Sequence, residues 1–250
     1  PFERLFPTQH GYARIVGKLV STLPSPYREA LLHSALLSYV DPLSCREALG
    51  LADAGGFFCA IQDANLPITK PLNRESPFVY DPMFRIALEQ ELSKRLTVEE
   101  YRELKRKVAS HYSVREERED AIRLLLSVGA NEEAAAEMEK ALDVELEKRR
   151  LDLALGWLRA LPVSVRQRHP RLLVQEARLS LARGRLDDAR ALLVAARREL
   201  EATRDDLGKG RLLGSWATLY ILEGRYKDAQ ISAENALKLL PDTEPADVAE

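Results

Sequence analysis

The chain has 250 residues, of which 46% are apolar and 30% are charged, a balance typical of globular proteins rather than of disordered or fibrous ones. Its 37 Lys and Arg residues nearly balance 39 Asp and Glu residues, and the net charge of -2 lacks the basic excess of a nucleic-acid-binding domain. No apolar run approaches the roughly 18 residues of a membrane span, and no signal peptide follows Pro1. We therefore expect a cytoplasmic protein without a membrane partner, and the absence of an initial Met suggests the middle of a longer chain.

The distribution of proline and glycine divides the chain. Nine of the 13 prolines precede residue 83, and no glycine occurs from 57 to 128. Because both residues interrupt helices, the first third should be rich in turns and the rest nearly continuous helix. We predict a tail of a preceding module over 1–22, a compact module over 23–97, and helical repeats over 98–250.

The compact module shows alternating helix and turn signals in chain order. Helices are expected over 13–23, 27–38, 42–49 and 57–64, and Ser25-Pro26 and Asp41-Pro42 each supply an N-cap followed by proline. Alternation at 68–72, a turn at 73–76 and residues 78–80 predict a short β-hairpin. Helices follow over 82–96 and 98–112, the second opened by a Thr97–Glu100 capping box. Three helices and a two-stranded wing are the order of a winged helix.

A winged helix usually suggests DNA binding through its third helix. Residues 54–66, which include that helix, contain no Lys or Arg, and their only charge is Asp63. Because phosphate contacts need cations, we expect no direct nucleic acid contact and favour a module that packs between larger domains.

Four short turn motifs predict a repeat in the second part. Gly129, Arg149, Gly184 and Gly224 each precede an alanine by five residues, at spacings of 20, 35 and 40. The last two spacings are near the 34-residue tetratricopeptide (TPR) period, and one helix over about 131–147 would serve both neighbours of the short step. The last repeat fits the TPR pattern at Leu213, Trp216, Ala217, Tyr220, Gly224, Tyr226, Ala229, Ala236 and Pro241. The expected fold is therefore mostly α, a winged-helix-like module followed by a TPR-like solenoid.

Residues that would carry catalysis or bind a cofactor are not grouped in this sequence. The one phosphate-loop lookalike, residues 11–19, has five residues between its glycines and ends in Leu19, where a hydroxyl must bind Mg²⁺. The four histidines lie far apart, without metal-ligand spacing. We expect no catalytic residues, no metal and no cofactor in this chain.

Several segments, taken in order, resemble one family: 23–49, 65–72, 78–92, 119–140 and 153–193. This set is similar to the middle of the large bacterial ATP-dependent activators of the maltose-regulator (MalT) type, LuxR-family proteins of the STAND class, over residues 13–240. The resemblance implies a nucleotide-binding module and a DNA-binding output domain outside this chain. It also implies that the winged helix couples the nucleotide module to a repeat domain that senses an inducer, and that the full-length protein self-associates.

The register of the repeats also gives a candidate binding surface. In TPR stacks the first helix of each pair lines the concave face, which would place Arg171, Arg178, Arg211 and Thr218 there. Convergent polar side chains in a cleft favour a site for a small-molecule inducer or a protein segment. The alternative is that these are solvated arginines whose stems pack on their own helices. For the chain as a whole, the alternatives are a freestanding TPR scaffold for protein–protein interaction or an enzyme of unrecognised chemistry.

Overall fold

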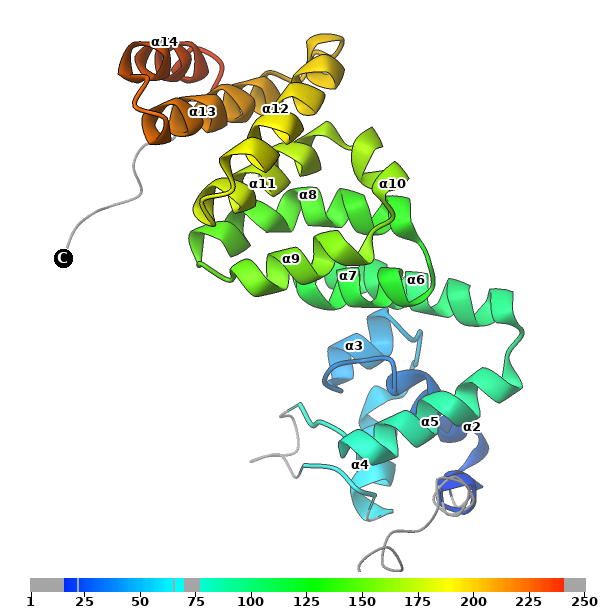
Figure 1. The fold of residues 1–250 in the computed structure, drawn as a ribbon. Helices are drawn as coiled ribbons and strands as arrows, with labels where there is room; N and C mark the ends of the chain where they lie inside the picture. The colour runs from blue at the N-terminus through cyan, green and yellow to red at the C-terminus, as the bar shows by residue number, and fades with distance from the viewer. Residues whose placement is uncertain (1–15, 22, 65, 70–76, 241–250) are drawn as a thin grey trace, which may run out of the picture. The chain divides into compact units, whose positions relative to one another are not determined.

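The computed structural model describes residues 16–21, 23–64, 66–69 and 77–240, which are mostly helical (Figure 1). Internal contacts divide the chain into two compact units, Pro1–Val128 and Gly129–Glu250. The sequence placed a boundary at 97/98, but α6 (Val98–Val114) packs against α7 (Arg118–Ser127) within the first unit. Of the helix expected over 13–23, residues 16–21 are helical, 13–15 and 22 lie outside the described residues, and Leu23 is not helical.

The first unit contains short helices that begin at local capping signals. Asp41 accepts hydrogen bonds from the backbone N–H groups of Leu43 and Ser44, both at 2.9 Å, and so caps α3 as predicted. The predicted Thr97–Glu100 capping box is also present. The predicted Ser25 cap is wrong, because α2 already includes Ser25 and Pro24 precedes it without a side-chain hydrogen bond. The helices up to α6 are α2 (Ser25–Ser34), α3 (Pro42–Glu47), α4 (Ala54–Asp63) and α5 (Pro82–Arg95).

The predicted β-hairpin is not shown by the described residues. Ile68 and Tyr80 form an isolated antiparallel bridge, while the turn expected at 73–76 lies outside the described residues. A second antiparallel bridge joins Phe78 to Val40, with reciprocal N–H···O bonds of 2.8 and 3.0 Å. The segment around residue 40, between α2 and α3, was not expected to pair, because a single bridging residue carries no period-two pattern.

Aromatic rings form the centre of this unit. The ring of Phe78 lies 5.1 Å from that of Phe58 and 5.4 Å from that of Tyr80, centroid to centroid. Tyr80 in turn lies 5.7 Å from Phe84, near the start of α5. Because the four rings come from α4, the bridged segment and α5, their burial fixes these elements against one another.

A polar cluster joins α3 to the end of α6. Ser44 Oγ lies 3.2 Å from His111 Nε2 and accepts a hydrogen bond of 3.0 Å from Arg115. Arg115 is also 3.5 Å from the Asp41 carboxylate, and His111 Nδ1 is 3.5 Å from Glu47. Buried polar groups that bond one another in this way specify how two helices meet.

The stability of the first unit should decrease in mild acid. Burial, with Arg115 adding to it, lowers the pKa of His111 below its usual 6.5, and burial lowers the pKa of His33. Because the unfolded chain then binds protons more readily, the stability is present above about pH 6.5 and is lost as pH falls through that value toward the folded-state pKa. Between about pH 7 and 5, the free energy of unfolding should fall less in His111→Asn than in the parent chain, as measured by unfolding at each pH. Identical pH profiles would contradict this assignment.

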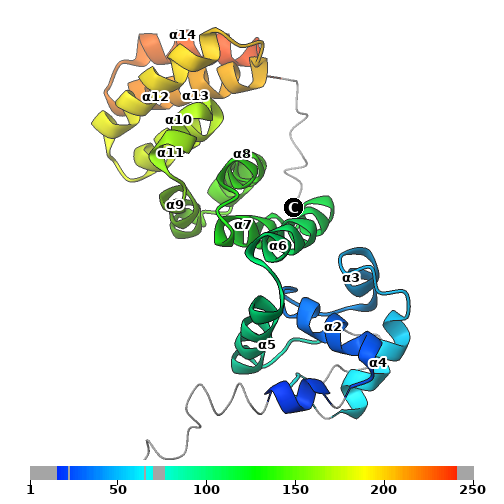
Figure 2. The same cartoon turned by 90° about the vertical axis from the view of Figure 1, so that its right-hand side faces the viewer.

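The second unit is built from antiparallel helices (Figure 2). The strongest packing is between α11 and α12 and between α13 and α14, so consecutive helices form hairpins. Their bounds are α8 (Asn131–Glu147), α9 (Leu151–Ala160), α10 (Val163–Arg168), α11 (Pro170–Ala182), α12 (Leu186–Glu201), α13 (Asp206–Leu222) and α14 (Tyr226–Leu237).

The backbone contains the four turns that the sequence aligned. Gly129, Gly184 and Gly224 have φ values of 70°, 72° and 74°, and Arg149, where the motif has no glycine, has φ of 56°. In each case the next helix begins two residues later, at Asn131, Leu151, Leu186 and Tyr226. The aligned alanines, Ala134, Ala154, Ala189 and Ala229, are all buried. A residue in the left-handed conformation ends a helix because it turns its own N–H and the next one toward the last carbonyls of that helix. This repeated turn therefore depends only on residues that are close in the sequence.

Candidate ligand-binding site

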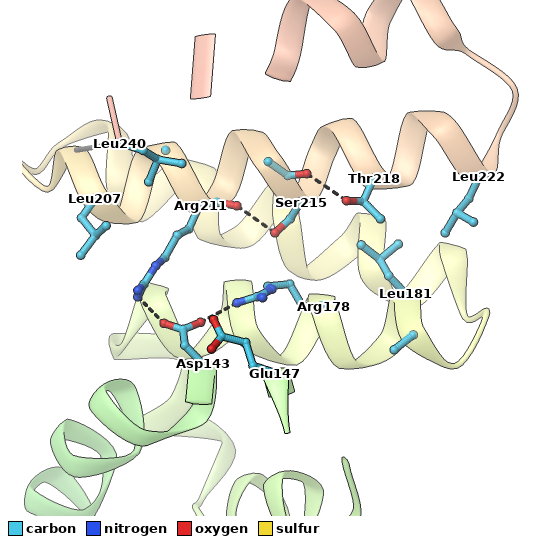
Figure 3. A pocket seen from close by; sticks show the side chains of 13 residues that line it. Asp143, Glu147, Arg178, Leu181, Leu207, Arg211, Ser215, Thr218, Leu222 and Leu240 are labelled. Carbon is cyan, nitrogen blue, oxygen red and sulfur yellow. Dashed lines mark hydrogen bonds and ion pairs between the residues drawn. The ribbon is translucent and has the colours of Figure 1, made fainter. Parts of the chain in front are cut away.

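The four residues predicted to line a concave face fall into two groups. Arg178, Arg211 and Thr218 line a cavity of about 750 Å³ in the second unit. Arg171 lies outside that cavity and borders a narrower hollow that it shares with Arg178 and Arg211. The cavity lies among α8, α11 and α13, with Leu240 after α14 (Figure 3).

The arginines are engaged by carboxylates that the sequence interpretation did not include. Arg171 donates two hydrogen bonds, of 2.6 and 2.5 Å, to Asp205, the N-cap residue of α13. Arg178 donates to Asp143 at 2.5 Å, and Arg211 pairs with the other oxygen of the same carboxylate. The predicted cations are therefore held in place by ion pairs rather than free in solvent.

The Arg171–Asp205 pair is mutually reinforcing. Its hydrogen bonds lower the pKa of the Asp205 carboxyl and raise the pKa of the Arg171 guanidinium, despite the opposing effect of burial. Asp205 also accepts a hydrogen bond from the N–H of Gly208 in the first turn of α13. Arg171 thus connects α11 to the start of α13, a structural role.

Asp143 occupies the centre of the site. Its side chain is nearly buried on α8, and Figure 3 shows it between Arg178 and Arg211 with Glu147 at its side. Ala141 and Leu142, which precede it, are also buried. Adjacent helical positions do not share a face, so no spacing in the sequence marked Asp143 as part of the site.

The remaining lining is small or apolar. Thr218 Oγ1 donates to the carbonyl of Gly214 at 3.1 Å, so its own helix already satisfies this hydroxyl. Leu181 and Leu222 lie toward one end of the cavity and Leu207 and Leu240 toward the other (Figure 3). A pocket with an apolar lining and a few oriented charges is the usual form of a small-molecule site.

Gly214 keeps part of the cavity open, because a Cβ at this position would find nothing within 4 Å. A glycine inside a helix costs about 0.5–1 kcal/mol relative to alanine. Gly214→Ala should therefore raise the free energy of unfolding of the second unit by about that amount, and Gly156→Ala on α9, equally unobstructed, should match it. Urea unfolding followed by tryptophan fluorescence measures both, and a loss of stability in Gly214→Ala alone would contradict the open space.

Among the residues that the structure describes, no group of His, Cys, Asp or Glu side chains could hold a metal ion. Within the same residues, no helix has the length and apolar character to cross a membrane.

Comparison with known proteins finds a similarity within the first unit. Residues 16–100 match the family model of the MalT winged helix domain. The chain therefore contains a MalT-like winged helix region. No curated protein and no solved structure matches the chain. The matched residues include α2 to α5 and the start of α6, so the match begins before residue 23, where the sequence placed the start of this module.

Proposed function

We propose that this chain is the regulatory middle region of a MalT-like, STAND-type bacterial transcriptional activator that acts in the cytoplasm. The match of residues 16–100 to the MalT winged helix domain carries the proposal. In it, the winged helix couples a nucleotide-binding module outside this chain to the helical second unit. That unit is TPR-like and senses a small-molecule inducer or binds a protein partner.

The first unit supports a role in coupling rather than in DNA binding. Its α4, at the position of a recognition helix, has the sequence AGGFFCAIQD without a single cation. The second unit supports a role in sensing, because its cavity of about 750 Å³ has a size suited to a small molecule and presents guanidinium groups.

The purified chain should neither hydrolyse ATP nor retard DNA, because the modules for both activities would lie elsewhere. A malachite green phosphate assay and a gel-shift assay check the two expectations. ATP hydrolysis that persists through purification would overturn the assignment of nucleotide chemistry to another module.

A genetic experiment tests the regulatory role directly. Deleting the gene that encodes this chain should lower a set of transcripts, and Gly214→Leu, which adds a side chain to the cavity lining, should lower the same set. Gly156→Leu is the matched control, because it adds the same side chain to a helix in open space away from the cavity. Unchanged transcripts in the deletion strain would overturn the proposal and favour a protein-binding scaffold.

A further inference from the structure

At the polar centre of the cavity, the ion-paired groups carry more positive than negative charge. One carboxylate, Asp143, serves two guanidinium groups, those of Arg178 and Arg211. Each arginine gives Asp143 one terminal nitrogen, and each side chain remains about one third exposed (35% and 33%). A guanidinium has five N–H groups, so both arginines keep donors for an additional acceptor. A ligand carboxylate placed there would complete the charge balance of the group.

Glu147 places a negative charge next to this group. It follows Asp143 by one helical turn on α8, which puts the two Cβ atoms about 5–6 Å apart on one face. Glu147 lines the cavity and is exposed, and no hydrogen bond or ion pair of its side chain occurs within the described residues. The cavity therefore presents, side by side, two guanidinium groups with spare N–H donors and the Glu147 carboxylate.

These charges exclude the simpler ligands. An anion without a positive group would be attracted by the arginines but repelled by Glu147. A cation without a negative group would be attracted by Glu147 but repelled by the arginines. An uncharged ligand would displace water from the guanidinium groups and from Glu147 without replacing its charge-assisted hydrogen bonds, which costs binding energy. Away from the charges, the walls formed by Leu181 and Leu222 are apolar, so the ligand also needs an aliphatic part.

We propose that the cavity binds a small zwitterion with an aliphatic side chain, that is, a free α-amino acid or a short peptide. Its carboxylate lies against Arg178 and Arg211, its ammonium group against Glu147, and its side chain against Leu181 and Leu222. This inference rests on the proposed function, since it names the chemical class of the inducer.

Isothermal titration calorimetry on the intact chain tests the ligand class. Leucine and leucyl-leucine are the probes. The probe that binds with the lower Kd shows whether the cavity prefers a free amino acid or a peptide. N-acetylleucine, which lacks the ammonium group, and leucinamide, which lacks the carboxylate, should each bind at least about tenfold more weakly, because each loses a charge-assisted contact. Equal affinity for all four compounds, or no binding of either probe at millimolar concentration, would overturn the proposal.

Variants locate the site. Glu147→Gln should weaken binding of the zwitterion about tenfold and leave the affinity for N-acetylleucine unchanged or improved. Gly214→Leu should weaken binding because it narrows the cavity, while Gly156→Leu, with the same helical change elsewhere, should bind as the parent does. Tryptophan fluorescence confirms that each variant is folded. Parent-like affinity in both Glu147→Gln and Gly214→Leu would place the ligand outside this cavity.

The binding and genetic experiments test the ligand class and the regulatory role separately. Zwitterion binding without any effect of deletion on transcripts would preserve the site and overturn the regulatory role. Transcript changes without zwitterion binding would preserve the regulatory role and overturn the ligand class.

Discussion

Replacing Phe78 with alanine should destabilise the first unit by about 3–5 kcal/mol, the usual cost of removing a fully buried aromatic ring. Phe78 is 1% exposed and its ring contacts those of Phe58 and Tyr80. Its backbone also pairs with Val40, so the cavity left behind lies where distant segments meet. Hydrogen exchange measured by mass spectrometry over residues 77–128 reads this unit separately from the other.

The neighbouring residue supplies the control. Val79 is 44% exposed, and Val79→Ala should change stability by no more than about 0.5 kcal/mol. The backbone carbonyl of Val79, which accepts a hydrogen bond from Thr69, is unaffected by the change. Similar losses in Phe78→Ala and Val79→Ala would show that the aromatic rings are not the core of this unit.

Replacing Asp143 with leucine should destabilise the second unit by about 2–3 kcal/mol. This is below the 3–5 kcal/mol typical of breaking a fully buried pair, because Arg178 and Arg211 are partly exposed and can turn toward water. Both tryptophans of the chain, Trp157 and Trp216, lie in this unit, so fluorescence during urea unfolding reports on it alone.

Two comparisons make this prediction specific. Glu147→Leu, one turn away and exposed, should change stability by no more than about 0.5 kcal/mol. A triple variant with Asp143→Leu, Arg178→Met and Arg211→Met should recover most of the loss, because apolar side chains can replace an ion-pair group without cost. Full stability in the single Asp143→Leu variant would show that the carboxylate does not hold the two arginines. The triple variant should not bind zwitterions, which separates the role of these charges in binding from stability.

Local features of both units were predictable from the sequence. The Asp41 cap, the Thr97–Glu100 capping box and the left-handed turns, including that at Arg149, depend on residues within one helical turn. The burial of Ala134, Ala154, Ala189 and Ala229 follows from the same turns, because a small residue at a fixed distance from each turn allows close helix approach. The sequence separation of a few neighbouring residues is therefore enough to predict these caps and turns.

The candidate site was predictable only in part. Thr218 and two of the three predicted arginines line the cavity, because helical periodicity places residues of α11 and α13 on one face. Asp143 and Glu147 were missed, because their helix, α8, is not the one that the repeat register assigned to this face. An ion pair over 35 residues, such as Arg178–Asp143, leaves no periodic signal, since any acid on a facing helix could serve.

By itself, the sequence determined the starts of α3 and α6, the four aligned turns and the burial of the alanines that follow them, since neighbouring residues set these features. It did not determine the ends of α2, which was expected over 27–38 and spans Ser25–Ser34. Only the tertiary structure decided that Val40 pairs with Phe78 and that one carboxylate pairs with two arginines from separate helices. Such contacts depend on packing between distant segments. Because of that packing, arginines that were expected to be free line a cavity in which they pair with a carboxylate.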